Sequence, residues 1–270
     1  SITVRKGSTM HIGTNGKVFV YDNSKILIEE GATLIIDQGA KIQLLGDNAV
    51  LEIKGDLKLT TNAIFTFTYP GGVNSGYVKF SRDTPWDNLP HILGAPGCSI
   101  ELVGKNKNDK ILEIAQDILF VSQFQSINLF KIQTGTVEFT KTERQFISVD
   151  APTSFVACKF ISSDVNDAVA VWGQPVCQIT NCLFDRVAVA GMLFMYGNKL
   201  SMSYTEIKNC NTAGLGTQGM GVNLFNTNFH SNESGMNSQL FTQNSAAAGA
   251  KFSDNNYGAS IWGSPVEVTF

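Results

Sequence analysis

The sequence of 270 residues predicts an all-β solenoid, in which coils of about 22–28 residues, each with three short strands, stack on one another. Three observations predict this fold class. Similar segments recur along the C-terminal half, glycine marks regular corners near the N-terminus, and only 16% of the residues are charged although 43% are hydrophobic. A single coil of this length cannot bury its own apolar face, whereas a stack of coils can.

Short alternating segments separated by glycine predict the N-terminal strands. Residues 31–36 (GATLII), 39–44 (GAKIQL) and 51–59 (LEIKGDLKL) recur at spacings of roughly eight to twelve residues. We therefore expect tighter coils over 1–68 than in the rest of the chain.

The domain organisation follows from the same reading. A loop-rich middle is expected over residues 69–135 and regular coils over 136–270, and 1–270 is predicted to form a single β-helix domain because no linker-like stretch interrupts it. Since both ends read as strands, we expect the chain to be part of a larger protein.

The middle of the chain contains interruptions and one ambiguous segment. Residues 69–76, 81–97 and 104–109 are expected to be loops that leave the coil. The segment 109–124 has apolar residues at helical spacing, which is typical of a short helix. Its many Ile, Val and Phe residues and its β surroundings favour strands instead.

Five segments in the C-terminal half align without gaps: 153–160, 177–184, 200–207, 222–229 and 250–257. They end on the anchor residues Phe160, Phe184, Ile207, Phe229 and Tyr257. Five residues before each anchor stands an apolar side chain: Phe155, Ile179, Met202, Leu224 and Phe252. The odd spacing between that position and the small residue two before the anchor requires a bend, and Asn tolerates the left-handed conformation of such a bend.

A third strand is expected between successive anchors. The candidates are residues 168–172, 191–196, 238–243 and 259–262. The first and last are followed by nearly identical turns, WGQPV and WGSPV.

Three strands per coil with an Asn-rich bend resemble the right-handed parallel β-helix of the pectate-lyase-like superfamily. The glycine-cornered N-terminal pattern resembles the opening coils of large bacterial cell-surface β-helix proteins and adhesins. These resemblances imply a right-handed parallel β-helix that is secreted or displayed at the cell surface.

Charge, hydropathy and cysteine content exclude several classes. A formal net charge of −3 disfavours nucleic-acid binding, and apolar runs of five or six residues are too short for membrane insertion. No CxxC or zinc spacing is present, and the odd count of five cysteines argues against a complete disulfide framework. We expect buried free thiols at Cys98, Cys158, Cys177, Cys182 and Cys210.

The pectate-lyase-like resemblance also implies where catalytic residues would stand. The hydrolases of that superfamily carry Asn-Thr-Asp, Asp-Asp, Gly-His-Gly and Arg-x-Lys motifs. The closest match here, Asn226-Thr227-Asn228, lacks the carboxylate, and the other three motifs are absent from the sequence. Because glycoside hydrolysis usually needs two carboxylates, no catalytic residue is predicted.

No metal or cofactor is predicted, although Ca²⁺ is left open. Asp83, Asp87 and His91 share one loop, and Asp164-Val165-Asn166-Asp167 offers oxygens, but a solvated loop and an ordinary turn explain both. The scattered histidines His11, His91 and His230 are expected to be polar surface residues.

The candidate binding residues are aromatic. Trp172, Tyr196 and Trp262 each stand just before the turn into the second strand, so they are expected along one edge of the stack. Exposed rings there would dock sugar rings, with Asn and Gln beside them binding hydroxyls. The alternative is that these rings cap the core.

The sequence therefore predicts a non-catalytic extracellular or cell-surface β-helix module for adhesion, glycan binding or structural display. Its expected partners are a polysaccharide or cell-surface molecule and other domains of a larger exported protein. One alternative is a polysaccharide lyase or glycoside hydrolase of the pectate-lyase-like superfamily, for which the fold resemblance is the support. Another is an assembly component that docks through its open coil ends.

Overall fold

The computed structural model describes most of the chain, and the statements below refer to the part it describes. That part consists of residues 1–66, 76–81, 91–115, 118–120, 127–140, 146–149, 152–163, 168–173, 177–192, 199–239, 245–262 and 268–269. The chain divides into two compact units, Ser1–Glu138 and Phe139–Phe270. Both units are built from parallel strands, and no helix occurs among the described residues.

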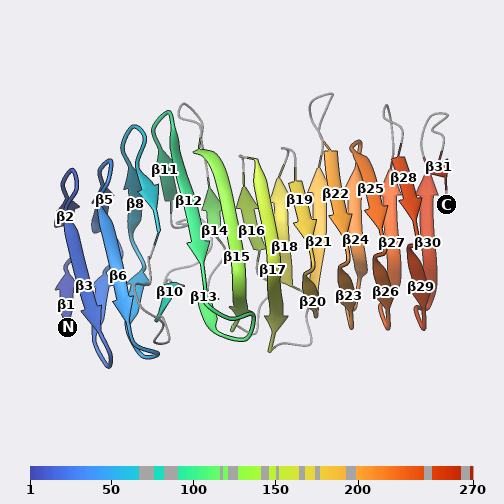
Figure 1. The fold of residues 1–270 in the computed structure, drawn as a ribbon, viewed down its shortest axis with the longest axis horizontal. Helices are drawn as coiled ribbons and strands as arrows, with labels where there is room; N and C mark the ends of the chain where they lie inside the picture. The colour runs from blue at the N-terminus through green and yellow to red at the C-terminus, as the bar shows by residue number, and fades with distance from the viewer. Residues whose placement is uncertain are drawn as a thin grey trace. The chain divides into compact units, whose positions relative to one another are not determined.

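The N-terminal unit winds its strands into stacked coils (Figure 1). Its strands are β1 (Ile2–Val4), β2 (Thr9–Ile12), β3 (Lys17–Tyr21), β4 (Lys25–Ile28), β5 (Thr33–Ile36), β6 (Lys41–Leu45), β7 (Val50–Ile53), β8 (Asp56–Leu59), β9 (Ile64–Phe65), β10 (Tyr77–Phe80), β11 (His91–Gly94), β12 (Cys98–Val103), β13 (Lys110–Ile114), β14 (Ile118–Phe120) and β15 (Ile127–Phe139).

The register of the first coils corrects one prediction. Ile2 pairs with Ile26, Thr9 with Thr33, and Lys17 with Lys41, so each coil advances by 24 residues. The spacing of eight to twelve residues seen in the sequence is the distance between consecutive strands of one coil. The coils over 1–68 are therefore no tighter than those of the C-terminal unit.

Alternation places the apolar side chains of these coils inside. On β5, Leu34 and Ile36 are buried, and on β6, Ile42 and Leu44 are buried. The ambiguous segment 109–124 contributes β13 and β14, so the strand alternative is confirmed for its described residues.

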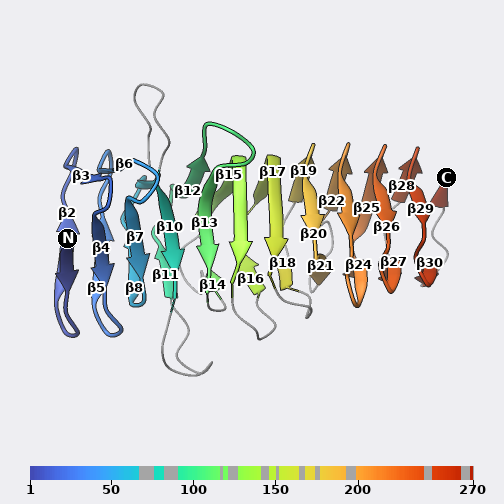
Figure 2. The same cartoon turned by 90° about the horizontal axis from the view of Figure 1, so that it is seen from below.

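The C-terminal unit contains the regular repeats. Its strands are β16 (Phe146–Val149), β17 (Thr153–Ser162), β18 (Ala168–Gly173), β19 (Cys177–Thr180), β20 (Leu183–Asp185), β21 (Val187–Met192), β22 (Lys199–Ser203), β23 (Glu206–Lys208), β24 (Ala213–Gln218), β25 (Gly221–Phe225), β26 (Asn228–His230), β27 (Ser234–Gln239), β28 (Ser245–Ala248), β29 (Lys251–Ser253), β30 (Tyr257–Trp262) and β31 (Val268–Thr269). Figure 2 shows β24, β27 and β30 side by side.

Four of the five predicted anchors form one buried row. Phe160 pairs with Phe184, Phe184 with Ile207, and Ile207 with Phe229. The rings of Phe160 and Phe184 stack with centroids 4.6 Å apart. The row five residues earlier is confirmed in the same way, from Phe155 through Ile179 and Met202 to Leu224.

The fifth anchor, Tyr257, is wrong. Phe252 takes that place, because it pairs with Phe229 and their rings stack at 5.0 Å. Leu224 pairs with Ala247, a residue too small to reveal a core position in a pattern of large apolar side chains. Tyr257 belongs to the next strand, β30, and is 66% exposed.

The predicted bend three residues before the anchor is confirmed. Ala157, Asn181, Tyr204 and Asn226 all have φ between 47° and 56°, and Gly249 occupies the same corner of the last coil with φ 69°. The residue that follows the bend residue donates a hydrogen bond back across the bend. Cys182 Sγ bonds the Thr180 carbonyl at 3.3 Å, and Thr205 Oγ1 bonds the Ser203 carbonyl at 2.9 Å. This contact explains why small thiol or hydroxyl side chains recur there.

A second corner was not predicted. It lies two residues after the anchor, where Arg186, Asn209, Ser231 and Asp254 have φ between 54° and 59°. The third strand begins soon after this corner. For this reason β21 and β27 start four residues before the predicted 191–196 and 238–243, whereas β18 matches its prediction and β30 starts two residues early.

Candidate functional site

The three predicted aromatic residues are only partly placed by the structure. Trp172 lies in β18 and Trp262 in β30, but their side chains, and Tyr196 altogether, lie outside the described residues. Trp172 pairs with Ala190, whereas Trp262 pairs with Gln239. Continued through β24, β27 and β30, this register places the two tryptophans in adjacent rows of one sheet, two residues apart along the strand.

The described members of these two rows are small or amide-bearing. The row of Trp172 continues through Gly216, Asn237 and Ser260, and the row of Trp262 contains Gln239 and Gln218. Asn237, Ser260 and Gln218 are exposed, and none of the side chains named in these two rows carries a charge. The surface beside the tryptophan positions thus offers amide and hydroxyl groups for hydrogen bonding.

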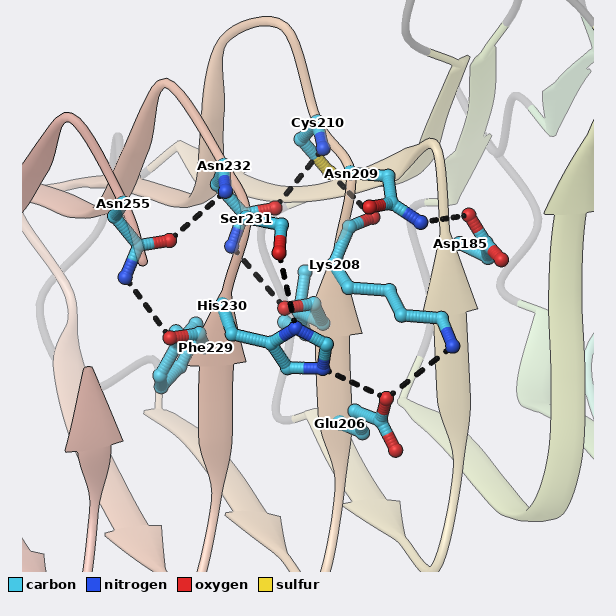
Figure 3. Close-up of polar contacts among 11 residues, drawn as sticks. Asp185, Glu206, Lys208, Asn209, Cys210, Phe229, His230, Ser231, Asn232 and Asn255 are labelled. Atoms are coloured by element: carbon cyan, nitrogen blue, oxygen red, sulfur yellow. Dashed lines mark hydrogen bonds and ion pairs between the residues drawn. The ribbon is translucent and has the colours of Figure 1, made fainter. Parts of the chain in front are cut away.

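A charged cluster lies on another face of the same unit, on the outward side of β23 and β26 (Figure 3). His230 Nε2 is 2.8 Å from Glu206 Oε1, and Lys208 Nζ is 3.4 Å from the same oxygen. The hydrogen bond from His230 lowers the pKa of Glu206, burial raises it by less, and Lys208 lowers it further. Glu206 is therefore a carboxylate near neutral pH and does not suit the role of a general acid.

The corner beside this cluster is built from amides. Asn209 Nδ2 donates to Asp185 Oδ1 at 2.9 Å, which partners the remaining acid in Figure 3. Asn232 Oδ1 accepts from the Cys210 N–H at 2.9 Å, and its Nδ2 donates to the Ile207 carbonyl at 3.1 Å. Asn255 Oδ1 accepts from the Asn232 N–H, which repeats the contact one coil further on. These amides join consecutive coils.

The N-terminal unit carries a second set of charges, arranged in one row across β7, β10 and β13. Glu52 pairs with Lys79 in register, and Lys79 with Glu113. Lys79 Nζ is 3.0 Å from Glu113 Oε1, and Lys25 Nζ is 2.9 Å from Glu52 Oε2. Ser81 Oγ donates to Glu52 Oε1 at 2.6 Å. Charges of alternating sign therefore neutralise one another along the stack.

Both buried carboxylates of this row are held in the ionised form. Burial alone would raise the pKa of Glu52, but hydrogen bonds from Ser81 and Lys25 outweigh it, so its pKa lies below the usual value. Burial also acts to raise the pKa of Glu113, and the bonds from Lys110 and Lys79 lower it on balance. Carboxylates stabilised in this way suit a structural ion-pair network better than proton transfer.

Sequence reasoning missed this row because the spacing of its members is irregular. Glu52, Lys79 and Glu113 are separated by 27 and 34 residues, so no constant period marks them. The alternating strands VLEI and YVKF, each with one charge among apolar residues, were the available signal.

The other predicted positions do not converge on a site within the described residues. Asp83, Asp87, Asp164, Asn166 and Asp167 lie outside them, as does the side chain of His91. Thr227 is buried, whereas Asn226 stands exposed at the corner. His11 forms an ion pair with Asp37 at 2.9 Å. In the part of the chain that the structure describes, no three His, Cys, Asp or Glu side chains gather to hold a metal ion.

The predicted free thiols are confirmed. All five cysteines are buried and unbridged. Burial raises the pKa of the Cys98 thiol to about 11 and that of Cys177 to about 12. Thiols with such pKa values are inert near neutral pH.

Comparison with known families agrees with this geometry. Residues 145–270 match a family model described as "Right handed beta helix region". Together with the parallel coils, this match confirms the right-handed parallel β-helix predicted from the sequence. No curated protein and no solved structure matches the chain. Among the described residues, no helix is long and apolar enough to cross a membrane.

Proposed function

We propose that this β-helix is a non-catalytic module that binds neutral glycans, in adhesion or display at the cell surface or outside the cell. The observation that carries the proposal is the pair of uncharged rows beside Trp172 and Trp262, with exposed Asn237, Ser260 and Gln218. Rings that stack on the C–H face of a sugar, next to amides that bind its hydroxyls, form a suitable surface for a neutral polysaccharide.

The test is retention on a glycan array by the full chain and by a variant that carries both Trp172→Ala and Trp262→Ala. We expect the double variant to lose at least about tenfold in affinity, which is about 1.4 kcal/mol, while its melting temperature stays unchanged. The variant Phe19→Ala, which removes an exposed ring from β3 of the N-terminal unit, is the control and should bind as the wild type does. A loss of stability without a loss of binding would show that the tryptophans cap the core and would overturn the proposed site.

A polysaccharide-cleaving enzyme is the second candidate, and one observation favours it. Glu52 and Glu113 flank Lys79 in one row, so two carboxylates and a lysine occur together. Their mutual pairing and the lowered pKa of both carboxylates argue for structure instead. We expect no unsaturated or reducing ends to appear when the protein is incubated with acidic polysaccharides. Release of such ends, abolished by Lys79→Met, would establish the enzyme.

A further inference from the structure

An exposed aromatic pair lies at the first corner of two consecutive coils of the C-terminal unit. Tyr204 follows the end of β22, and Phe225 ends β25. Their side chains are 59% and 46% exposed, and their ring centroids are 5.3 Å apart at an interplanar angle of 83°. Water-exposed rings of this size gain nothing from burial, so their presence calls for another explanation.

The backbone of Tyr204 adds a second, independent observation. Its φ of 50° lies in the left-handed region, which is unfavourable for a bulky residue. The same corner is occupied by Asn181 in the preceding coil, and by Asn226 and Gly249 in the following ones, residues that tolerate this conformation well. An aromatic ring is therefore held at a position where the fold itself favours a small residue.

The surroundings of the pair are polar and uncharged. Phe225 lies in register between Ser203 and Ala248, whose side chains are too small to cover its ring. Ser203 Oγ is 3.1 Å from Thr180 Oγ1, which places two hydroxyls in the same row. Asn181 and Asn226, the corner residues on either side of Tyr204, are both exposed.

We propose that Tyr204 and Phe225 form a binding site for one pyranose unit of a neutral glycan. Their rings stack against the C–H face of the sugar, and the amide of Asn226 together with the hydroxyls of Ser203 and Thr180 binds its hydroxyl groups. The lack of charge in both rows disfavours uronate polymers and phosphorylated ligands, which require cationic partners. The site is separate in sequence from Trp172 and Trp262, and it rests on the proposed glycan binding.

The experiment measures binding of neutral oligosaccharides by titration calorimetry and on an array, for the wild type, Tyr204→Asn and Phe225→Ala. Asn is the residue that neighbouring coils use at this corner, so Tyr204→Asn keeps the bend and relieves its strain. We expect it to weaken neutral glycan binding at least about tenfold while melting at or above the wild-type temperature. Phe225→Ala should weaken binding to a similar extent.

Matched controls come from the N-terminal unit, where Tyr21 and Phe19 on β3 are 63% and 47% exposed. Tyr21→Asn and Phe19→Ala should leave binding unchanged. A further variant, Asn226→Gly, keeps the left-handed bend but removes the amide, and should weaken binding several-fold.

The outcomes separate this site from the broader function. If the wild type and Tyr204→Asn bind neutral glycans equally, the inference is overturned while the proposed function stands. If the wild type binds no glycan, both are overturned. If Tyr204→Asn instead melts several degrees lower, or the wild type retains proteins through this pair but no sugar, the pair serves packing or protein docking and the site is likewise refuted.

Discussion

Single side chains close the corners of the C-terminal coils, and the sequence predicted part of this. The −3 bend was predicted from Asn181 and Asn226, because Asn reaches the left-handed region at low cost. Tyr204 could not be recognised as strained before the bend was placed. The second corner was missed because Arg186 and Ser231, which occupy it in two coils, carry no conformational signal of their own.

Glu206 makes stability depend on pH at the same scale. Because its folded-state pKa is lowered, it stabilises the fold above the pKa of the unfolded chain, and this contribution is lost as pH falls through the lower folded value. We expect Glu206→Gln to be less stable than the wild type at pH 7 by about 0.5 kcal/mol, since the side chain is 41% exposed and its ion pairs are screened by solvent. Urea unfolding at pH 7 and at pH 3 should show the difference shrinking at the lower pH.

The exposed Glu233 provides the control for this effect. Glu233→Gln should change stability at pH 7 by less than Glu206→Gln does. A constant difference between Glu206→Gln and the wild type at both pH values would contradict the assignment of the effect to ionisation of Glu206.

Among the structural elements, the inner rows were the most predictable feature. The large residues from Phe155 to Leu224 share one face because side chains alternate along strands, and this alternation is visible in sequence. The last coil was misaligned because Ala247 fills the place of a large residue. The polar corners were less predictable, since an inward Asn and an outward Asn look the same in a sequence.

Asn232 provides the clearest test of these corners. It is 3% exposed, and it bonds the Cys210 N–H and the Ile207 carbonyl of the preceding coil. Replacement by Ala would leave both backbone groups buried without partners. We expect Asn232→Ala to lower the free energy of unfolding by about 2–4 kcal/mol, measured by urea denaturation.

The neighbouring amide of Asn256 is exposed, so Asn256→Ala should cost less than about 0.5 kcal/mol. Equal losses in Asn232→Ala and Asn256→Ala would mean that the hydrogen bonds between coils contribute little to stability.

The charge distribution of the whole chain has a structural cause. Only 16% of the residues are charged, as expected for stacked coils in which like charges would repel along each row. The row through Glu52, Lys79 and Glu113 avoids this repulsion by alternating its signs. Sequence alone could not place these residues in one row, because the stretches between β9 and β10 and between β10 and β11 change the coil length.

The alternating row leads to the last prediction. Lys79→Met removes the cation between two buried carboxylates and leaves Glu113 to Lys110 alone, so we expect a loss of about 2–4 kcal/mol in urea denaturation at pH 7. The double variant Lys79→Met, Glu113→Leu removes the unpaired charge as well and should recover part of this loss. Lys41→Met, at an exposed lysine of β6, is the control. The loss in Lys79→Met should shrink at pH 3, because protonation removes the charge of both carboxylates, whose pKa values are lowered by pairing in the folded state. A loss no larger than that of Lys41→Met would show that the row is an incidental surface arrangement and contributes nothing to the stack.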